Sequence, residues 1–204
     1  MTGVIHVAGE DQQLALPGTL WPAGCDRGQG DPLFFAPITR RQANELLEHF
    51  GHPLGAYNRP FGYQAWGLAV DGVAAAVAVS GSTIGATVAK TPYRRKQVVE
   101  LARIARHPGH DGIQRVMLRI WRDYLARRWA DDYWPVEAAV SYALPGKVGN
   151  LYRFDGWAHL GEVKPWMGSK DGNGGWSKPS KANRIADGKK RIFVYKYPQG
   201  AGQS

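Results

Sequence analysis

Two stretches of the chain place apolar residues at the three- and four-residue spacing of an amphipathic helix. The first opens on the capping-box pattern Thr39-x-x-Gln42 and is expected to end near Gly51. The second predicts a helix over residues 113–130, with an apolar face and an arginine-rich face. The apolar positions are Ile113, Val116, Met117, Ile120, Trp121, Tyr124 and Leu125. The opposite face carries Arg115, Arg119, Arg122, Arg127 and Arg128.

Further apolar runs predict six strands, bounded by Gly, Pro, Asn or Asp. They span residues 33–37, 63–70, 73–80, 97–105, 136–144 and 191–197. The second and third flank Asp71-Gly72, a strong signal for a hairpin turn, and are expected to pair antiparallel. Residues 97–144 predict a β-α-β unit with a right-handed parallel crossover. A loop and a short helical turn are expected within residues 145–157.

The element order β-α-β-β-β-α-β-α-β predicts a mixed α/β or α+β fold with one domain and a mostly antiparallel central sheet. A doubly wound Rossmann sheet is disfavoured, because the chain lacks both Gly-x-Gly-x-x-Gly and Gly-x-x-x-x-Gly-Lys-Ser/Thr. Residues 1–32 are expected to be an irregular amino-terminal arm, 33–197 the domain, and 198–204 a tail. Residues 163–190 are basic and Gly-rich, and are expected to be a functional loop or disordered.

Positive charge is unevenly spread along the 204-residue chain. The whole sequence has 26 Lys+Arg and 17 Asp+Glu, which gives a formal net charge of +9. Residues 90–128 hold 11 bases and 3 acids, and residues 159–204 hold 9 bases and 3 acids. Two such segments favour a polyanionic partner, and we expect double-stranded DNA. The alternative is that the charge serves solubility alone.

Cysteine usage and hydropathy exclude several classes of protein. Cys25 is the single cysteine, which excludes an internal disulfide and a thiolate-rich zinc site. The longest apolar stretch, around residues 73–79, is far shorter than the roughly 20 residues that a membrane span needs. The amino terminus lacks the pattern of a secretory signal. We therefore expect a soluble cytoplasmic protein without a membrane partner, either a monomer or a dimer.

The turn between the strand at 97–105 and the long helix contains Gly109 and Gly112. Glycines let the backbone approach a ligand closely, and the first N–H groups of a helix attract an anion. The turn is therefore a candidate site for a phosphate or pyrophosphate. The alternative is an ordinary connection, because Gly and Pro often precede helices.

Charged and hydroxyl side chains interrupt two of the predicted strands. Glu100 and Arg103 lie in an apolar strand, where each is expected to have a partner, in an ion pair or in a substrate. Strand parity places them on opposite faces, so they are not expected to pair with each other. Ser141 and Tyr142 stand near the carboxyl end of the next strand, where ligands of open α/β sheets bind. Tyr152, in the helical turn that follows, can protonate a leaving thiolate or stack in the core.

His49 and His52 flank the end of the first helix and are candidate metal ligands if a third group joins them. The alternative is that both are polar loop residues. Aromatic and basic side chains also gather in or beside loops, which suits stacking on an extruded base and contact with a nucleic acid backbone. They are Tyr57, Tyr63, Trp66, Trp166, Trp176, Arg59, Lys164, Lys170 and Lys178. The same aromatics can instead close a small core.

The strand order, with one β-α-β unit and a glycine turn, resembles the GCN5-related N-acetyltransferase (GNAT) fold. In that fold two parallel strands splay and acyl-coenzyme A lies between them. The turn at residues 106–114 resembles its pyrophosphate loop, but keeps two glycines of the usual Gln/Arg-x-x-Gly-x-Gly/Ala pattern. The donor-binding residues that the resemblance implies are Ile104, Ala105, Gly109, Gly112 and Ile113.

Three stretches carry a closer resemblance, to the Mom DNA-modification proteins of phage Mu type, a divergent branch of this fold. They are Val99-Glu100-Leu101-Ala102-Arg103; Ser141-Tyr142-Ala143 with Gly149-x-x-Tyr152-Arg153, Trp157 and Gly161; and Lys190-Arg191-Ile192-Phe193-Val194-Tyr195. Mom proteins place a carbamoylmethyl group on the exocyclic N6 amine of adenine in phage DNA, which blocks restriction. The resemblance implies transfer of such a group, or of an acyl group, in the cytoplasm of a host cell, with the base flipped out of the duplex. An aromatic or arginine side chain is then expected to fill the gap or stack on the base, with Trp66, Tyr57 and Tyr142 as candidates.

The resemblance also implies roles for the polar residues of these stretches. Arg103 and Ser141 orient the donor or the base, Glu100 fixes Arg103 or accepts the amine proton, and Tyr152 acts near the leaving group. The expected DNA-binding residues are Tyr57, Arg59, Trp66, Arg94, Arg95, Lys96, Lys164, Lys170, Lys178, Lys181 and Arg184.

An iron site is a further implication, with His49 or His52 and a downstream aspartate, Asp155 or Asp171, as ligands. Two alternative functions stay open. A GNAT acyltransferase acting on the amine of a small molecule or a protein predicts coenzyme A binding with little salt-sensitive affinity for DNA. A DNA-binding protein without chemistry predicts tight, salt-dependent binding and an unmodified product.

Overall fold

Seven strands of the described residues form one mixed sheet in the order β1-β2-β3-β4-β5-β7-β6. The structure, a computed structural model, describes residues 33–70, 73–164 and 188–198. The strands are β1(Leu33–Pro37), β2(Tyr63–Val70), β3(Val73–Gly81), β4(Val98–Arg106), β5(Ala138–Ala143), β6(Ala158–Val163) and β7(Lys190–Lys196). The helices are α1(Arg40–His49), α2(Ile113–Ile120), α3(Trp129–Asp132) and α4(Asn150–Arg153), with a 3₁₀ turn η2(Arg95–Gln97) and a π-helical turn η3(Trp121–Leu125).

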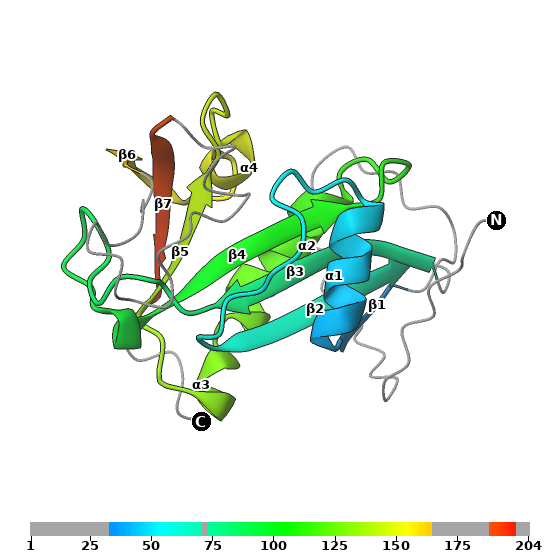
Figure 1. Cartoon of the computed structure of the whole chain (residues 1–204), viewed down its shortest axis with the longest axis horizontal. Helices are drawn as coiled ribbons and strands as arrows, with labels where there is room; N and C mark the ends of the chain where they lie inside the picture. The colour runs from blue at the N-terminus through cyan, green and yellow to red at the C-terminus, as the bar shows by residue number, and fades with distance from the viewer. Residues whose placement is uncertain (1–32, 71–72, 165–187, 199–204) are drawn as a thin grey trace, which may run out of the picture.

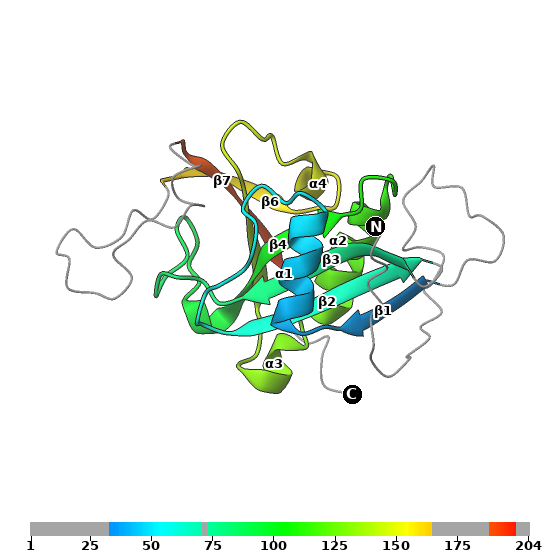
Figure 2. The same ribbon diagram turned by 45° about the vertical axis from the view of Figure 1, so that its right-hand side comes forward.

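All neighbouring strands pair antiparallel except β4 and β5, which are parallel. Helix α1 lies over β2 and β3 on one face, and α2 lies over β3 and β4 on the other (Figure 1, Figure 2). The antiparallel meander and the β4-α2-β5 crossover confirm the predicted mixed sheet. No helix in the described part of the chain is long and apolar enough to cross a membrane.

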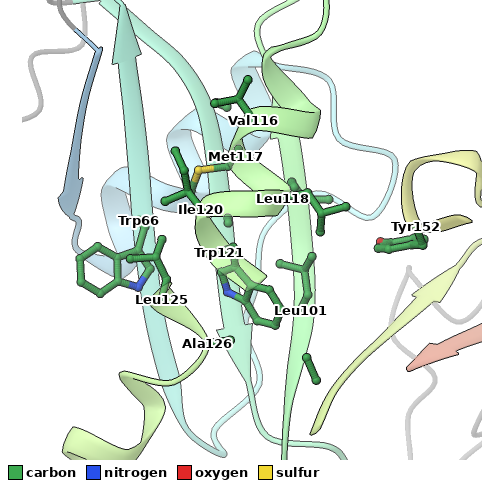
Figure 3. Close-up of a cluster of buried hydrophobic side chains, with 14 of the residues drawn as sticks. Trp66, Leu101, Val116, Met117, Leu118, Ile120, Trp121, Leu125, Ala126 and Tyr152 are labelled. Atoms are coloured by element: carbon green, nitrogen blue, oxygen red, sulfur yellow. The ribbon is translucent and has the colours of Figure 1, made fainter. Parts of the chain in front are cut away.

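The main hydrophobic core lies between α2 and the sheet. Met117 and Trp121 are fully buried there, and Figure 3 shows Trp121 beside Leu101 of β4. Strand β3 is rich in buried alanines, which lets the helices approach both of its faces closely. The apolar face predicted for the second helix is therefore the face that packs on the sheet.

The long helix predicted over residues 113–130 is not continuous. It is α-helical to Ile120 and then widens into η3, where the Ala126 N–H donates to the Trp121 carbonyl at 2.7 Å. The wider turn rotates the side chains that follow it. Leu125 stays buried, but Tyr124, which the spacing assigns to the apolar face, is 48% exposed.

Strand β6 is absent from the predicted elements. None of its side chains is buried, so it carries neither an apolar run nor an alternating pattern. It forms the edge of the sheet and pairs with β7. The expectations for the arm at 1–32, for most of the 163–190 loop and for nearly all of the tail lie outside the described residues.

A buried hydrogen bond ties η3 to the sheet. Trp121 Nε1 donates to Ser80 Oγ at 2.8 Å, and both residues are fully buried. We expect Ser80→Ala to lower the free energy of unfolding by about 1–3 kcal/mol, because the indole N–H loses its acceptor inside the core. Urea unfolding followed by tryptophan fluorescence measures the change, with Thr87→Ala at an exposed position as the control. Equal stability of Ser80→Ala and the unchanged protein would contradict this role.

Candidate active site

Strands β4 and β5 part from each other halfway along β4. They pair from Val98 with Ala138 to Leu101 with Ser141. Beyond this point β4 stays with β3 and β5 stays with β7, so the two arrows diverge (Figure 1). A cavity of about 430 Å³ lies where they part. Its walls come from both strands, the loop after α1 and residues 147–152, which makes it the candidate donor site.

A β-bulge in β4 lies at the point of divergence. Two consecutive residues of β3 pair with Arg103 and Leu101, so Ala102 has no partner in β3. The extra residue shifts the alternation of side chains along the strand. Glu100 and Arg103 therefore lie on the same face, beside the loop that follows α1. The prediction that they occupy opposite faces is wrong.

The hydroxyl groups of Ser141 and Tyr152 meet at the wall of the cavity, on the α2 side. Ser141 Oγ lies 2.8 Å from the Tyr152 hydroxyl oxygen and 3.0 Å from the Leu101 carbonyl oxygen. A carbonyl can only accept, so both contacts are hydrogen bonds when Ser141 donates to Leu101 and Tyr152 donates to Ser141. Burial raises the pKa of Tyr152. The phenol therefore keeps its proton at neutral pH, as a group that delivers a proton must.

A charged cluster occupies the opposite side of the same strands. Arg59 donates to the Glu100 carboxylate at 2.7 Å, so this arginine is the ion-pair partner that Glu100 requires. Arg103 donates to the carbonyl oxygens of Gly55 at 3.3 Å and Ala102 at 2.7 Å. Burial and the charge of Arg59 lower the pKa of Arg103 to about 10. Glu100 is thus hydrogen-bonded to Arg59 and not to Arg103.

Lys190 and Tyr142 border this cluster. Lys190 is half-buried, and burial with the charges of Arg59 and Arg103 lowers its pKa. The Tyr142 side chain lines the cavity, and burial with the Glu100 carboxylate raises its pKa. Sequence analysis does not mark Lys190 as a site residue, because its position depends on β7 lying between β5 and β6.

The glycine turn before α2 is held together by Arg106. Its Nη1 donates to three carbonyl oxygens of the turn at 2.8 to 3.3 Å, and Nη2 pairs with Asp111 at 2.9 Å. Gly112 has a φ of +78°, which favours glycine at the start of α2. The Gly109 N–H donates to His107 Nδ1 at 3.0 Å, so it faces that ring and not a ligand. The part of the turn that remains a candidate for anion binding is therefore the first turn of α2.

The other expected donor-binding residues divide between the cavity and the core. Ile104 lines the cavity. Ala105 and Ile113 are buried in the cores on the α1 side and the α2 side respectively, so their side chains are not exposed to a donor. Gln114, which sequence analysis misses, lines the cavity and donates from Nε2 to the Ile104 carbonyl at 3.3 Å. An amide at the second position of a helix has no distinctive signal in one sequence.

Two of the three aromatic residues expected to stack on an extruded base, Tyr57 and Trp66, are buried, whereas the third, Tyr142, is half-buried and lines the cavity. Tyr57 has no exposed surface, and its hydroxyl donates to the Gly62 carbonyl at 3.3 Å. Trp66 is 7% exposed and lies near Leu125 in the α2-side core (Figure 3). The expected role of Tyr57 and Trp66 in stacking is therefore wrong, and the alternative that they close a core is confirmed.

The expected basic surface is exposed in part. Arg94, Lys96 and Lys164 are exposed. Arg95 donates to the carbonyl oxygens of Gly85, at 3.3 Å, and Ile84, so it closes the loop before β4. Arg59 is held in its ion pair with Glu100. The remaining expected residues lie outside the described part of the chain: Lys170, Lys178, Lys181 and Arg184.

The expected metal site does not form around His49 and His52 in the described residues. No group of three or more His, Cys, Asp or Glu residues that could hold a metal is present there. His52 Nδ1 accepts the Leu54 N–H at 3.2 Å. A neutral imidazole has one free lone pair, so this hydrogen bond leaves His52 without a lone pair for a metal. His49 is exposed and its ring lies 6.0 Å from that of His107.

Asp155 has a structural role in place of the suggested iron ligation. Its side chain is fully buried and accepts from Arg119 at 2.6 Å and Arg115 at 3.3 Å. Arg122 also donates to the Asp155 carbonyl at 2.6 Å. These contacts join the turn after α4 to the arginine face of the long helix. The other suggested ligand, Asp171, lies outside the described residues.

No family model and no curated protein matches the chain. Among solved structures, a putative acetyltransferase from Salmonella typhimurium with its cofactor acetyl-CoA is similar, with a TM-score of 0.50 and 15% identity over 83% of this chain and 96% of that chain. The chain has the GNAT acetyltransferase fold. The ribosomal-protein-S18-alanine N-acetyltransferase from Escherichia coli is also similar, with a TM-score of 0.49 and 14% identity over 79% of this chain and 90% of that chain. At these identities the likeness concerns the fold alone.

The pKa of His52 predicts how stability depends on pH. Burial and the charge of Arg103 lower this pKa from 6.5 to about 4. Between these values the unfolded chain binds a proton at His52 and the folded chain does not, so the free energy of unfolding should fall as the pH is lowered from 6.5 towards 4. We expect a smaller fall in His52→Gln. Urea unfolding across this pH range measures it, with the exposed His159→Gln as the control; parallel pH profiles for all three proteins would contradict the shift.

Proposed function

We propose that the protein transfers a small acyl group from acyl-CoA, or a related thioester, to the exocyclic N6 amine of adenine in DNA. The observation that carries the proposal is the divergence of β4 and β5 around a cavity with the Tyr152 hydroxyl at its wall. Beyond Leu101, β4 has an edge that β5 does not pair, which suits an extended ligand that hydrogen-bonds along a strand. The first turn of α2 suits the diphosphate of such a donor.

Tyr152 and Ser141 supply one of the two proton transfers that this reaction needs. With the donor bound, the amine nitrogen joins the acyl carbon and the carbon–sulfur bond breaks, so sulfur gains a proton and nitrogen loses one. The Tyr152 hydroxyl, which like any tyrosine is protonated at neutral pH, holds the proton for sulfur. Ser141 can then turn its proton from the Leu101 carbonyl to the tyrosine oxygen and stabilise the phenolate. Ser141 is thus a positioning residue.

Glu100 is our candidate for the group that takes the amine proton. Its side chain is 5% exposed. Glu100 directly precedes Leu101, the last residue of β4 that pairs with β5, and its side chain lies on the face of the sheet opposite Tyr152. The two proton transfers are therefore assigned to the two sides of the strand junction. Arg59 holds the carboxylate in place at 2.7 Å.

The charge of the protein supports DNA as the acceptor. The net charge is +9, and Arg94, Lys96 and Lys164 are exposed. Lys147 is exposed at the cavity itself. Exposed bases of this kind neutralise phosphates and make binding sensitive to salt.

A second candidate acceptor is the amine of a smaller molecule or of a protein. The burial of Tyr57 and Trp66 favours it, because two of the three side chains on which an extruded adenine was expected to stack are not at the surface. This candidate differs from the first in predicting acetyl-CoA binding without salt-sensitive affinity for DNA.

Nucleoside mass spectrometry of plasmid DNA from expressing cells tests the proposal. We expect a deoxyadenosine of increased mass with the unchanged protein and with Tyr124→Phe, an exposed control. Tyr152→Phe, checked for folding by circular dichroism, should reduce the product by about a hundredfold or more, because the leaving group loses its proton donor. Unmodified deoxyadenosine with folded protein would favour the second candidate. Equal product from Tyr152→Phe would contradict the role of the phenol.

A further inference from the structure

The charged cluster beside the cavity holds more positive than negative groups. Arg59 pairs with one carboxylate, Glu100, and Arg103 lies on the same face of β4 beside the loop that follows α1. Lys190 is half-buried near them, and burial with the charges of both arginines lowers its pKa. The guanidinium carbons of both arginines lie 5.8 Å from the centroid of the Tyr57 ring. Glu100 forms its ion pair with Arg59, with 2.7 Å between Arg59 Nη1 and Glu100 Oε2. The cluster therefore has two positive charges in excess.

Arg103 is a buried positive charge that no carboxylate among the described residues pairs with. It is 7% exposed, and its hydrogen bonds go to two neutral carbonyl oxygens. Within the described ranges, no carboxylate forms a salt bridge with Arg103 or Lys190. A buried charge without a counter-charge is costly, so a protein that keeps one gains when an anion binds beside it. Arg103 also lines the cavity, which gives an anion access to it.

We propose that Arg103, Lys190 and Arg59 form a subsite for an oxyanion of the acceptor substrate. The planar fork of an arginine matches the two oxygens of a phosphate, and a lysine adds a compact charge. The identity of the oxyanion rests on the proposed function, under which it is a phosphate of the nucleotide that carries the target adenine. The subsite would hold that nucleotide beside the point where β4 and β5 part.

The same subsite lies directly beside Glu100. Arg59 Nη1 donates to one oxygen of this carboxylate at 2.7 Å, and the other N–H groups of the guanidinium can bind an oxyanion. The ion pair uses only one carboxylate oxygen, so Glu100 keeps lone pairs that can accept the amine proton. An oxyanion held by Arg59 would therefore place the acceptor close to its proton acceptor.

Binding of 2′-deoxyadenosine 5′-monophosphate and of deoxyadenosine, without any donor, tests the subsite. Isothermal titration calorimetry at low salt should show about tenfold tighter binding of the monophosphate, because only its phosphate accepts charge-assisted hydrogen bonds from the cluster. We expect the preference for the monophosphate to disappear in Arg103→Gln and to weaken in Lys190→Gln. Because Lys190 is only half-buried, the second variant tests the subsite even if Arg103→Gln does not fold. Lys196→Gln, exposed on the same strand, is the control and should keep the preference.

An equal preference for the monophosphate in all four proteins would overturn the subsite. Binding of coenzyme A, measured in the same way, shows whether the oxyanion belongs to the donor or to the acceptor. If Arg103→Gln loses affinity for coenzyme A but not for the monophosphate, the oxyanion belongs to the donor and the assignment to the acceptor is overturned. If Arg103 confers the preference for the monophosphate but the protein leaves DNA unmodified, the subsite is supported and the proposed function is contradicted. If DNA is modified but the monophosphate is not preferred, the proposed function is supported and the subsite is contradicted.

Discussion

The hydrogen bond from Ser141 to the Leu101 carbonyl stands at the end of the short parallel ladder between β4 and β5. The Ser141 hydroxyl donates to the Leu101 carbonyl on the edge of β4, at the last residue pair of the β4–β5 ladder. From there β4 remains paired with β3, β5 remains paired with β7, and the bulge at Ala102 adds a residue to β4. The cavity exists because these two strands follow different partners. Because Ser141 also contacts the Tyr152 hydroxyl, the same residue sets both the end of the ladder and the position of the phenol.

The strand junction separates two chemical environments. On the α2 side, the phenol of Tyr152 is buried among apolar and aromatic side chains, which keeps it neutral. On the α1 side, Glu100 and its neighbouring cations form a charged cluster. A transfer reaction that delivers a proton to one atom and removes one from another is served by such a division, because the proton donor and the proton acceptor stand on different sides of the junction.

The sequence predicts the elements that carry their own pattern, namely the helices, the hairpin and the β-α-β unit. It also predicts that Glu100, Arg103, Ser141 and Tyr152 lie near the site. What it misses depends on contacts that no local pattern records. Strand parity fails at a bulge that only the pairing with β3 reveals, and β6 has no buried face to mark it. The partner of Glu100 is 41 residues away along the chain.

Hydrogen–deuterium exchange of the backbone, measured with and without acetyl-CoA, tests most directly whether the parted strands hold the donor. Slower exchange on addition of acetyl-CoA is expected at residues 102–106 of β4 and at the start of α2, because a bound donor covers the free strand edge and the helix end. Strands β1 and β2 lie on the far side of β3 and should exchange at unchanged rates. Unchanged exchange at β4 and α2 with saturating acetyl-CoA, or protection confined to other elements, would contradict a donor site between β4 and β5.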